Sequence, residues 1–157
     1  MLKARRSRNS IMTKPILILN GPNLNMLGTR EPELYGKQTL DDIKVICIKR
    51  ASSLGLTVDF SNSNAESELI DWIQEASKEH AAIILNAGAY THTSIAILDA
   101  LRVTDIPIVE VHLSNIFQRE EYRHVSFVSQ AAHGVICGFG SKGYELALDA
   151  VAELISQ

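Results

Sequence analysis

Glu110 and His112 stand two residues apart in the apolar segment PIVEVHL and could form an acid–base pair. In an extended chain, side chains at positions i and i+2 leave the same face, so the carboxylate and the imidazole would lie side by side. A carboxylate in that place fixes the tautomer of the ring and favours its protonated form, which can donate a proton. The alternative is a solvated histidine beside an incidental acid.

Tyr35 ends the segment REPELY, which begins at Arg30. A phenol with an ordinary pKa of about 10 is a poor base until a nearby cation favours the phenolate. Lowering that pKa by one unit requires about 1.4 kcal/mol, which one or two guanidinium groups can supply. Arg30 and Arg119 are the candidate cations. Taken alone, Tyr35 would more often be a packing residue.

Asn23, Asn86 and His92 follow short apolar runs and could bind a polar ligand through hydrogen bonds. Asparagine is also an ordinary turn residue. Turn chemistry explains one of these positions but not the whole set, so we expect them to converge on one region.

Arg123 follows Arg119 by four residues in the segment REEYR. One helical turn would place both guanidinium groups on the same face, where they could bind a carboxylate. The alternative is a solvated amphipathic turn. Asp99, within a predicted helix, would ordinarily be a surface acid or a helix–helix contact.

Several patterns do not support cofactor or metal chemistry. Gly138, Gly140 and Gly143 spell G-x-G-x-x-G, but too little chain follows for the second half of a dinucleotide site. The sequence has neither a Walker phosphate loop nor a recognisable zinc spacing, and the strand-end motifs hold no lysine for an imine. Cys47 and Cys137 lie in apolar runs and are predicted to be buried, reduced thiols. The sequence therefore predicts no metal and no cofactor.

The elements that must position these residues alternate along the chain. Apolar, β-rich runs predict strands, and longer patterns of helical period separate them. The strands are expected at 16–19, 56–60, 82–85, 108–111 and 135–137, and the helices at 39–54, 67–80, 93–103 and 142–155, with a long loop over 20–39 and a short helix within 115–123. Thr39 is the expected N-cap of the first helix, and Gly55 its stop.

Such alternation predicts a flavodoxin-like, doubly wound α/β fold, with a five-stranded parallel sheet in a three-layer α/β/α arrangement. Ligands of such sheets bind outside the carboxyl ends of the strands. The motifs NGPNLN, NAGAYTHTS and EVHLSN all follow predicted strands and would meet at that edge.

The 157 residues, 46% of them hydrophobic, are enough for one domain with a single core. Residues 1–14 carry five basic residues and no acid, whereas residues 15–157 have a net charge of −8. We expect the first segment to be a disordered basic arm or an upstream start, with Met12 as an alternative initiator, and 15–157 to be the catalytic domain. A body this acidic is a poor partner for nucleic acid or an anionic membrane, and we expect a cytoplasmic protein.

Five sequence blocks, taken in this order, closely resemble the type II 3-dehydroquinate dehydratases of the shikimate and quinate pathways. The blocks are NGPNLNMLGTREPELYG from Asn20, SNSNAESELIDWI from Ser61, LNAGAYTHTSIAILDAL from Leu85, EVHLSNIFQREEYR from Glu110 and GFGSKGY from Gly138. The resemblance extends from Pro15 to the end of the chain.

The resemblance implies dehydration of 3-dehydroquinate to 3-dehydroshikimate, by anti elimination through an enolate and without a cofactor. It implies that Tyr35 is the base, that Arg30 stabilises the phenolate and the transition state, and that Asn23 holds a water for the enolate. His112 would protonate the departing hydroxyl, with Glu110 orienting and charging it.

The resemblance further implies a set of substrate-binding residues: Asn86, His92, Leu113, Ser114, Arg119 and Arg123. It places Asp99 at the site of a neighbouring subunit and implies a homo-oligomer, a dodecamer built from trimers. The alternatives are an inactive homologue that keeps only the assembly, and a flavodoxin-like module that binds a nucleotide.

Overall fold

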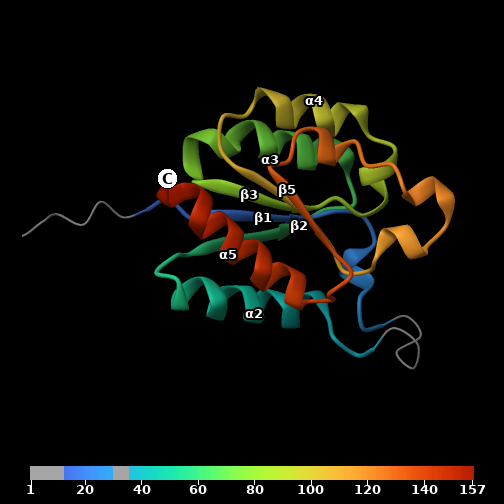
Figure 1. Cartoon of the computed structure of the whole chain (residues 1–157), viewed down its shortest axis with the longest axis horizontal. Helices are drawn as coiled ribbons and strands as arrows, with labels where there is room; N and C mark the ends of the chain where they lie inside the picture. The colour runs from blue at the N-terminus through green and yellow to red at the C-terminus, as the bar shows by residue number, and fades with distance from the viewer. Residues whose placement is uncertain (1–12, 30–35) are drawn as a thin grey trace, which may run out of the picture.

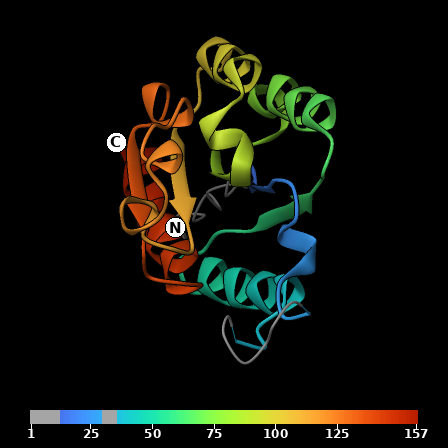
Figure 2. The same cartoon turned by 90° about the vertical axis from the view of Figure 1, so that its right-hand side faces the viewer.

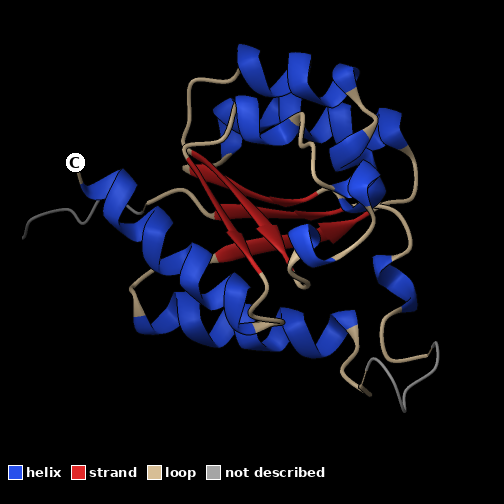
Figure 3. Ribbon diagram, turned by 45° about the vertical axis from the view of Figure 1, so that its right-hand side comes forward, coloured by secondary structure: helices blue, strands red, loops and turns tan. Residues whose placement is uncertain are grey.

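The computed structural model describes residues 13–29 and 36–157 and contains one five-stranded sheet (Figure 3). All strand pairs are parallel, and the strand order is β2-β1-β3-β4-β5. The strands are β1 (Ile16–Asn20), β2 (Val58–Asn62), β3 (Ala82–Asn86), β4 (Ile108–His112) and β5 (Gly134–Cys137). The predicted doubly wound fold is therefore confirmed.

Within residues 13–29 and 36–157, four α-helices cover the two faces of the sheet (Figure 1). They are α2 (Leu40–Ser53), α3 (Glu66–Glu79), α4 (Ile95–Val103) and α5 (Lys142–Ser156). Helices α2 and α5 pack on one face, and α3 and α4 pack on the other. No helix in the described ranges is both long and apolar enough to span a bilayer.

Alternate residues of the strands supply two separate cores. Ile16 and Ile18 face α2 and α5, whereas Leu17 and Leu19 face α3 and α4. All five positions of β1, β3 and β4 are buried. This burial on both faces is why these strands show as continuous apolar runs rather than as an alternating pattern.

Helix α2 begins as its sequence predicts. The Thr39 hydroxyl accepts a hydrogen bond from the Asp42 N–H at 3.1 Å, and the Asp42 carboxylate accepts one from the Thr39 N–H at 2.9 Å. Those hydrogen bonds to Thr39 lower the pKa of Asp42. The helix is followed by Gly55 at φ 72°, a left-handed conformation in which glycine carries no Cβ penalty.

Three expectations require correction. The second strand runs over Val58–Asn62 rather than 56–60, because it pairs with β1 from Ile16 to Asn20, and backbone pairing includes polar residues that the apolar pattern omits. Cys137 is half-buried, since it lies in the edge strand β5. The long loop contains the 3-10 helix η1 (Leu24–Met26). The predictions for residues 1–12, Arg30 and Tyr35 fall outside the described residues.

The glycine pattern after β5 forms a turn, as expected. Gly138 and Gly140 have positive φ values of 95° and 58°. A Cβ on Gly143 would lie 3.6 Å from Ile136 and 3.9 Å from the carbonyl oxygen of His112. Both are ordinary van der Waals distances, so the start of α5 lies in contact with the carboxyl ends of β4 and β5.

The carboxyl ends of β1 and β3 approach each other closely at Gly21. Its N–H donates a 2.8 Å hydrogen bond to the carbonyl of Asn86, and a Cβ at this position would lie 2.3 Å from the carbonyl oxygen of Ala87. Only glycine fits here without moving one strand end away from the other.

We predict that Gly21→Ala lowers the free energy of unfolding by about 1–3 kcal/mol, the usual cost of forcing an extra carbon into a packed site. Gly134→Ala is the matched control, because the described structure places nothing within 4 Å of a Cβ there. Chemical denaturation at one fixed protein concentration measures both. Equal effects of the two substitutions would contradict the proposed clash.

Candidate active site

The candidate site lies at the carboxyl edge of the sheet, where the chain crosses from one side of β1 to the other. The strand order places β2 and β3 on opposite sides of β1, which is the topological switch point of this fold. The segments that follow β1, β3 and β4 surround this edge (Figure 2). They include η2 (Gly88–His92), η3 (Ile116–Gln118), η4 (Glu121–Arg123) and η5 (Val128–Gln130).

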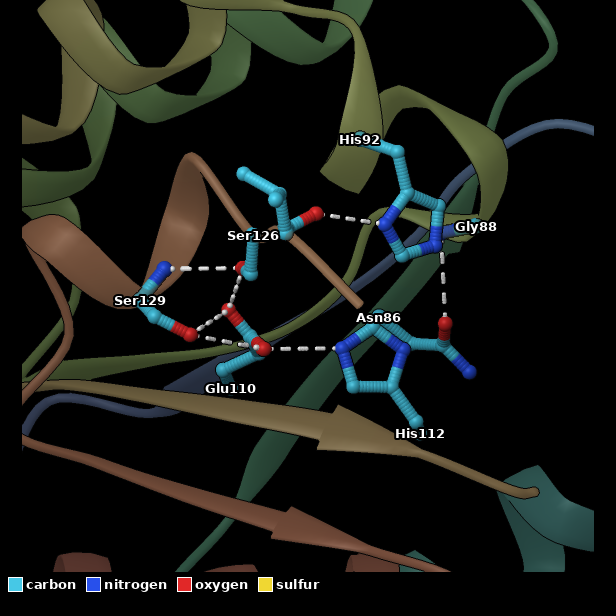
Figure 4. A network of polar contacts seen from close by, with 8 residues as sticks. Asn86, Gly88, His92, Glu110, His112, Ser126 and Ser129 are labelled. Carbon is cyan, nitrogen blue, oxygen red and sulfur yellow. Dashed lines mark hydrogen bonds and ion pairs between the residues drawn. The ribbon is translucent and has the colours of Figure 1, made fainter. Parts of the chain in front are cut away.

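Glu110 and His112 form a buried pair at this edge, which confirms that they share one face of the strand (Figure 4). The Nε2 atom of His112 lies 2.8 Å from Oε2 of Glu110. The side chains are 6% and 0% exposed, respectively. The pair is therefore not a solvated histidine beside an incidental acid.

Two serine hydroxyls complete the surroundings of the Glu110 carboxylate (Figure 4). Ser126 donates to Oε1 at 2.6 Å, and Ser129 lies 3.0 Å and 3.2 Å from Oε1 and Oε2. An ionised carboxylate only accepts hydrogen bonds, so His112 donates its Nε2–H to Glu110. The other ring nitrogen, Nδ1 of His112, is then the atom that can exchange a proton with a substrate.

His92 lies beside His112, with ring centroids 6.3 Å apart and an interplanar angle of 18°. Its Nδ1 is 2.7 Å from the carbonyl oxygen of Val125. Because a carbonyl can only accept, Nδ1 of His92 carries a hydrogen, and Nε2 is left to accept one in the neutral ring. The two imidazoles thus leave different nitrogens available to a substrate at this edge of the sheet, Nδ1 of His112 and Nε2 of His92.

Asn86 belongs to a buried network that joins the strand ends to α5. Its Nδ2 donates to the Tyr144 hydroxyl at 2.9 Å, and that hydroxyl donates to Oδ1 of Asn20 at 2.6 Å. Asn20 in turn donates to the carbonyl of Ser61 at 3.1 Å. Burial raises the pKa of Tyr144, so its hydroxyl stays protonated. The Oδ1 of Asn86 accepts from the Gly88 N–H at 3.3 Å.

Arg119 and Arg123 do not share a helical turn, contrary to expectation. Residues 119 and 120 are extended, so η3 and η4 are separate. Both guanidinium groups nevertheless lie near the Glu120 carboxylate, with Nε of Arg123 at 2.8 Å and Nε of Arg119 at 3.8 Å. A backbone hydrogen bond and the Arg123 side chain lower the pKa of Glu120. Ser114 lies 3.5 Å from Nη1 of Arg119, at the limit of a hydrogen bond.

The remaining predicted residues occupy less connected positions. Asn23 is exposed in the left-handed conformation at φ 68°, and its N–H donates to Asn64. The carbonyl of Leu113 accepts from the Gly140 N–H at 2.9 Å. Asp99 is exposed on α4, and within the described ranges no hydrogen bond or ion pair joins it to the other site residues.

Sequence reasoning missed Asn20, Tyr144, Ser126 and Ser129. A tyrosine in the apolar stripe that continues with Ala147, Leu148 and Val151 was a usable signal, because a buried phenol requires a hydrogen-bond partner. The serines gave no comparable signal, since they are 16 and 19 residues from Glu110 in the sequence.

Cys47 is fully buried in the core that faces α2 and α5. Burial, with a smaller contribution from Glu145, raises the pKa of Cys47 to about 12, so its thiol is not a nucleophile. Among the described residues, no three His, Cys, Asp or Glu side chains gather as a metal site requires.

Comparison with known proteins agrees with this fold. The family model for dehydroquinase class II matches residues 14–152. The chain is 55% identical over 146 residues to the 3-dehydroquinate dehydratase of Streptomyces coelicolor, covering 92% of this chain and 93% of that protein. It is 57% identical over 143 residues to the enzyme of that name from Phenylobacterium zucineum, covering 91% and 99%. The crystal structure of the type II dehydroquinase from Propionibacterium acnes superposes with a TM-score of 0.85 at 46% identity, covering 90% and 98%. The chain therefore belongs to the class II dehydroquinase family.

Proposed function

We propose that this chain dehydrates 3-dehydroquinate to 3-dehydroshikimate in the shikimate or quinate pathway. In this reaction a proton leaves the carbon beside the ketone, an enolate forms, and the C–O bond to the hydroxyl breaks with release of water. These steps require a base, an enolate stabiliser and an acid, none of which needs to be a metal or cofactor. The buried Glu110–His112 pair, in a chain of this family, is the observation that carries the proposal.

Tyr35 is the proposed base for the first step, with Arg30 as the cation that favours its phenolate. Both assignments rest on the resemblance of the segment REPELY to the family, because both residues lie outside the described part of the chain. Asn23 would hold a water that donates to the enolate oxygen.

His112 is the proposed acid for the second step. Glu110 holds the Nε2–H, so a protonated His112 would donate its proton from Nδ1 to the departing hydroxyl. The carboxylate offsets the positive charge of the imidazolium in a buried place, where an unpaired charge would be costly. The ring then returns to the neutral form with its Nε2–H bond intact.

Substrate binding is assigned to the residues around this pair. Asn86 and His92 would bind substrate hydroxyls, and Leu113 and Ser114 would contribute partly through backbone amides. Arg123 would bind the substrate carboxylate in place of Glu120, its present partner, with Arg119 close by.

We also propose a cytoplasmic homo-oligomer, a dodecamer built from trimers, in which Asp99 reaches a neighbouring subunit's site. The exposure of Asp99 on α4 supports this role, because an exposed side chain can contact a neighbouring subunit. Residues 1–14 are proposed as a basic arm that precedes the catalytic domain.

The direct test is conversion of 3-dehydroquinate by the purified chain, followed by the ultraviolet absorbance of the conjugated product. We expect product formation that neither a chelator nor borohydride treatment reduces, because the reaction uses neither a metal nor an imine. A folded oligomer that forms no product would favour the inactive-homologue alternative. Loss of activity with borohydride would point to an imine mechanism.

Tyr35→Phe should lower kcat by about 100-fold or more, because positioned acid–base groups contribute roughly 10²–10⁴-fold. Only the proton-accepting oxygen is removed, so binding of 3-dehydroquinate measured by calorimetry should be nearly unchanged. Tyr122→Phe is the control, since Tyr122 is 67% exposed. Turnover by Tyr35→Phe close to wild type would assign the base to another residue.

His112→Ala should slow loss of the hydroxyl by about 100-fold or more while the base still removes the substrate proton. Deuterium incorporation from D₂O into unreacted 3-dehydroquinate measures the first step, and product formation measures both steps together. We expect the ratio of exchange to dehydration to rise. Equal slowing of both processes would mean that His112 does not act in the second step alone.

A further inference from the structure

One short segment, residues 125–129, contacts His92 and the Glu110 carboxylate that binds His112 (Figure 4). The carbonyl of Val125 binds Nδ1 of His92 at 2.7 Å. The hydroxyl of Ser126, the next residue, lies 2.6 Å from the Glu110 carboxylate, and that of Ser129 lies 3.0 Å from it. The segment thus reaches His92 directly and His112 through Glu110.

This segment is itself held in place. The N–H of Phe127 donates to the carbonyl of Thr91 at 2.9 Å, next to His92. Val128 is fully buried in the core beneath α3 and α4. The Ser126 hydroxyl accepts from the N–H of Ser129 at 3.0 Å. The two serines therefore face Glu110 from a fixed backbone rather than from a free loop.

Each serine hydroxyl can act toward the Glu110 carboxylate in one way, as a hydrogen-bond donor. A hydroxyl has one proton, and an ionised carboxylate has none, so Ser126 and Ser129 can only donate to Glu110. Glu110 is fully buried and accepts from these hydroxyls and from His112. Such donors satisfy the oxygens of a buried carboxylate and fix its orientation. Without them, Glu110 would have His112 as its remaining partner among the described residues.

We propose that Ser126 and Ser129 are positioning residues for proton donation by His112. They orient the Glu110 carboxylate, and Glu110 in turn holds the Nε2–H of His112 so that Nδ1 faces the substrate. This inference rests on the proposed function only in its kinetic consequence. The tautomer that the serines impose on His112 does not depend on which substrate is bound.

The first experiment compares Ser126→Ala, Ser129→Ala and the double variant with the wild type. We expect dehydration to slow by roughly 10-fold for Ser126→Ala, a typical effect of one hydrogen bond to a charged group, and by more for the double variant. KM should change by less than about 2-fold, because neither serine contacts the substrate in this proposal. The ratio of deuterium exchange to dehydration should rise, because only the acid step is affected.

Two controls separate positioning from general damage. Ser77→Ala removes a half-buried hydroxyl whose 2.6 Å contact with Thr104 lies away from the site, and should leave the ratio unchanged. Ser129→Thr keeps the hydroxyl at an exposed position and should restore most of the activity. Exchange and dehydration that slow together in the alanine variants, or activity equal to wild type in the double variant, would overturn the proposal.

A second measurement does not depend on turnover. Nitrogen-15 chemical shifts of the imidazole rings show which nitrogen carries the proton. In the wild type, Nε2 of the neutral His112 ring should be protonated, and in the double variant the two tautomers should mix, while His92 keeps its Nδ1–H. An unchanged His112 tautomer would overturn the proposal. If the wild type lacked activity but the shifts behaved as expected, only the proposed function would fail.

Discussion

The buried carboxylate of Glu110 is the constraint on which the site depends. Removing a carboxylate from water is costly unless its oxygens receive hydrogen bonds. Here the donors come from β4 itself and from the segment that precedes β5, namely His112, Ser126 and Ser129. These hydrogen bonds form when all of these elements are in place, so the chemistry of the site and the packing of the α3–α4 face of the sheet are coupled.

A second buried network fixes the opposite part of the same edge. Tyr144 on α5 joins Asn20 at the end of β1 to Asn86 at the end of β3. Removing any one of these groups would leave a buried partner without a hydrogen bond. The cost in stability would therefore exceed the value of the single bond that is lost. Together with the close approach at Gly21, it sets the spacing of the strand ends at the switch point. Asn86 therefore enters the site already oriented by α5.

Local periodicity predicted the parts of this structure that depend on neighbours in sequence. The spacing of two residues between Glu110 and His112 was enough to place them on one face, and Thr39 was enough to start α2. Pairing between distant segments was harder to predict, so the apolar pattern placed β2 two residues too early. The prediction of a continuous helical turn over REEYR was wrong, because the backbone is extended at residues 119–120. No residue within REEYR signals this break in the sequence. Ser126 and Ser129 were missed because only the folded chain brings them to Glu110.

The two histidines show why residue type alone does not define the chemistry here. Both rings lie at the same edge of the sheet, nearly parallel and 6.3 Å apart, yet their hydrogen bonds differ. A carbonyl fixes the proton of His92 on Nδ1, and a carboxylate fixes that of His112 on Nε2. Among the described residues, His112 is the one of the two rings that lies beside a carboxylate, which suits it to the proposed role of acid, while His92 is suited to accept a hydrogen bond through Nε2. The difference arises from their partners, which for both rings depend on the segment 125–129.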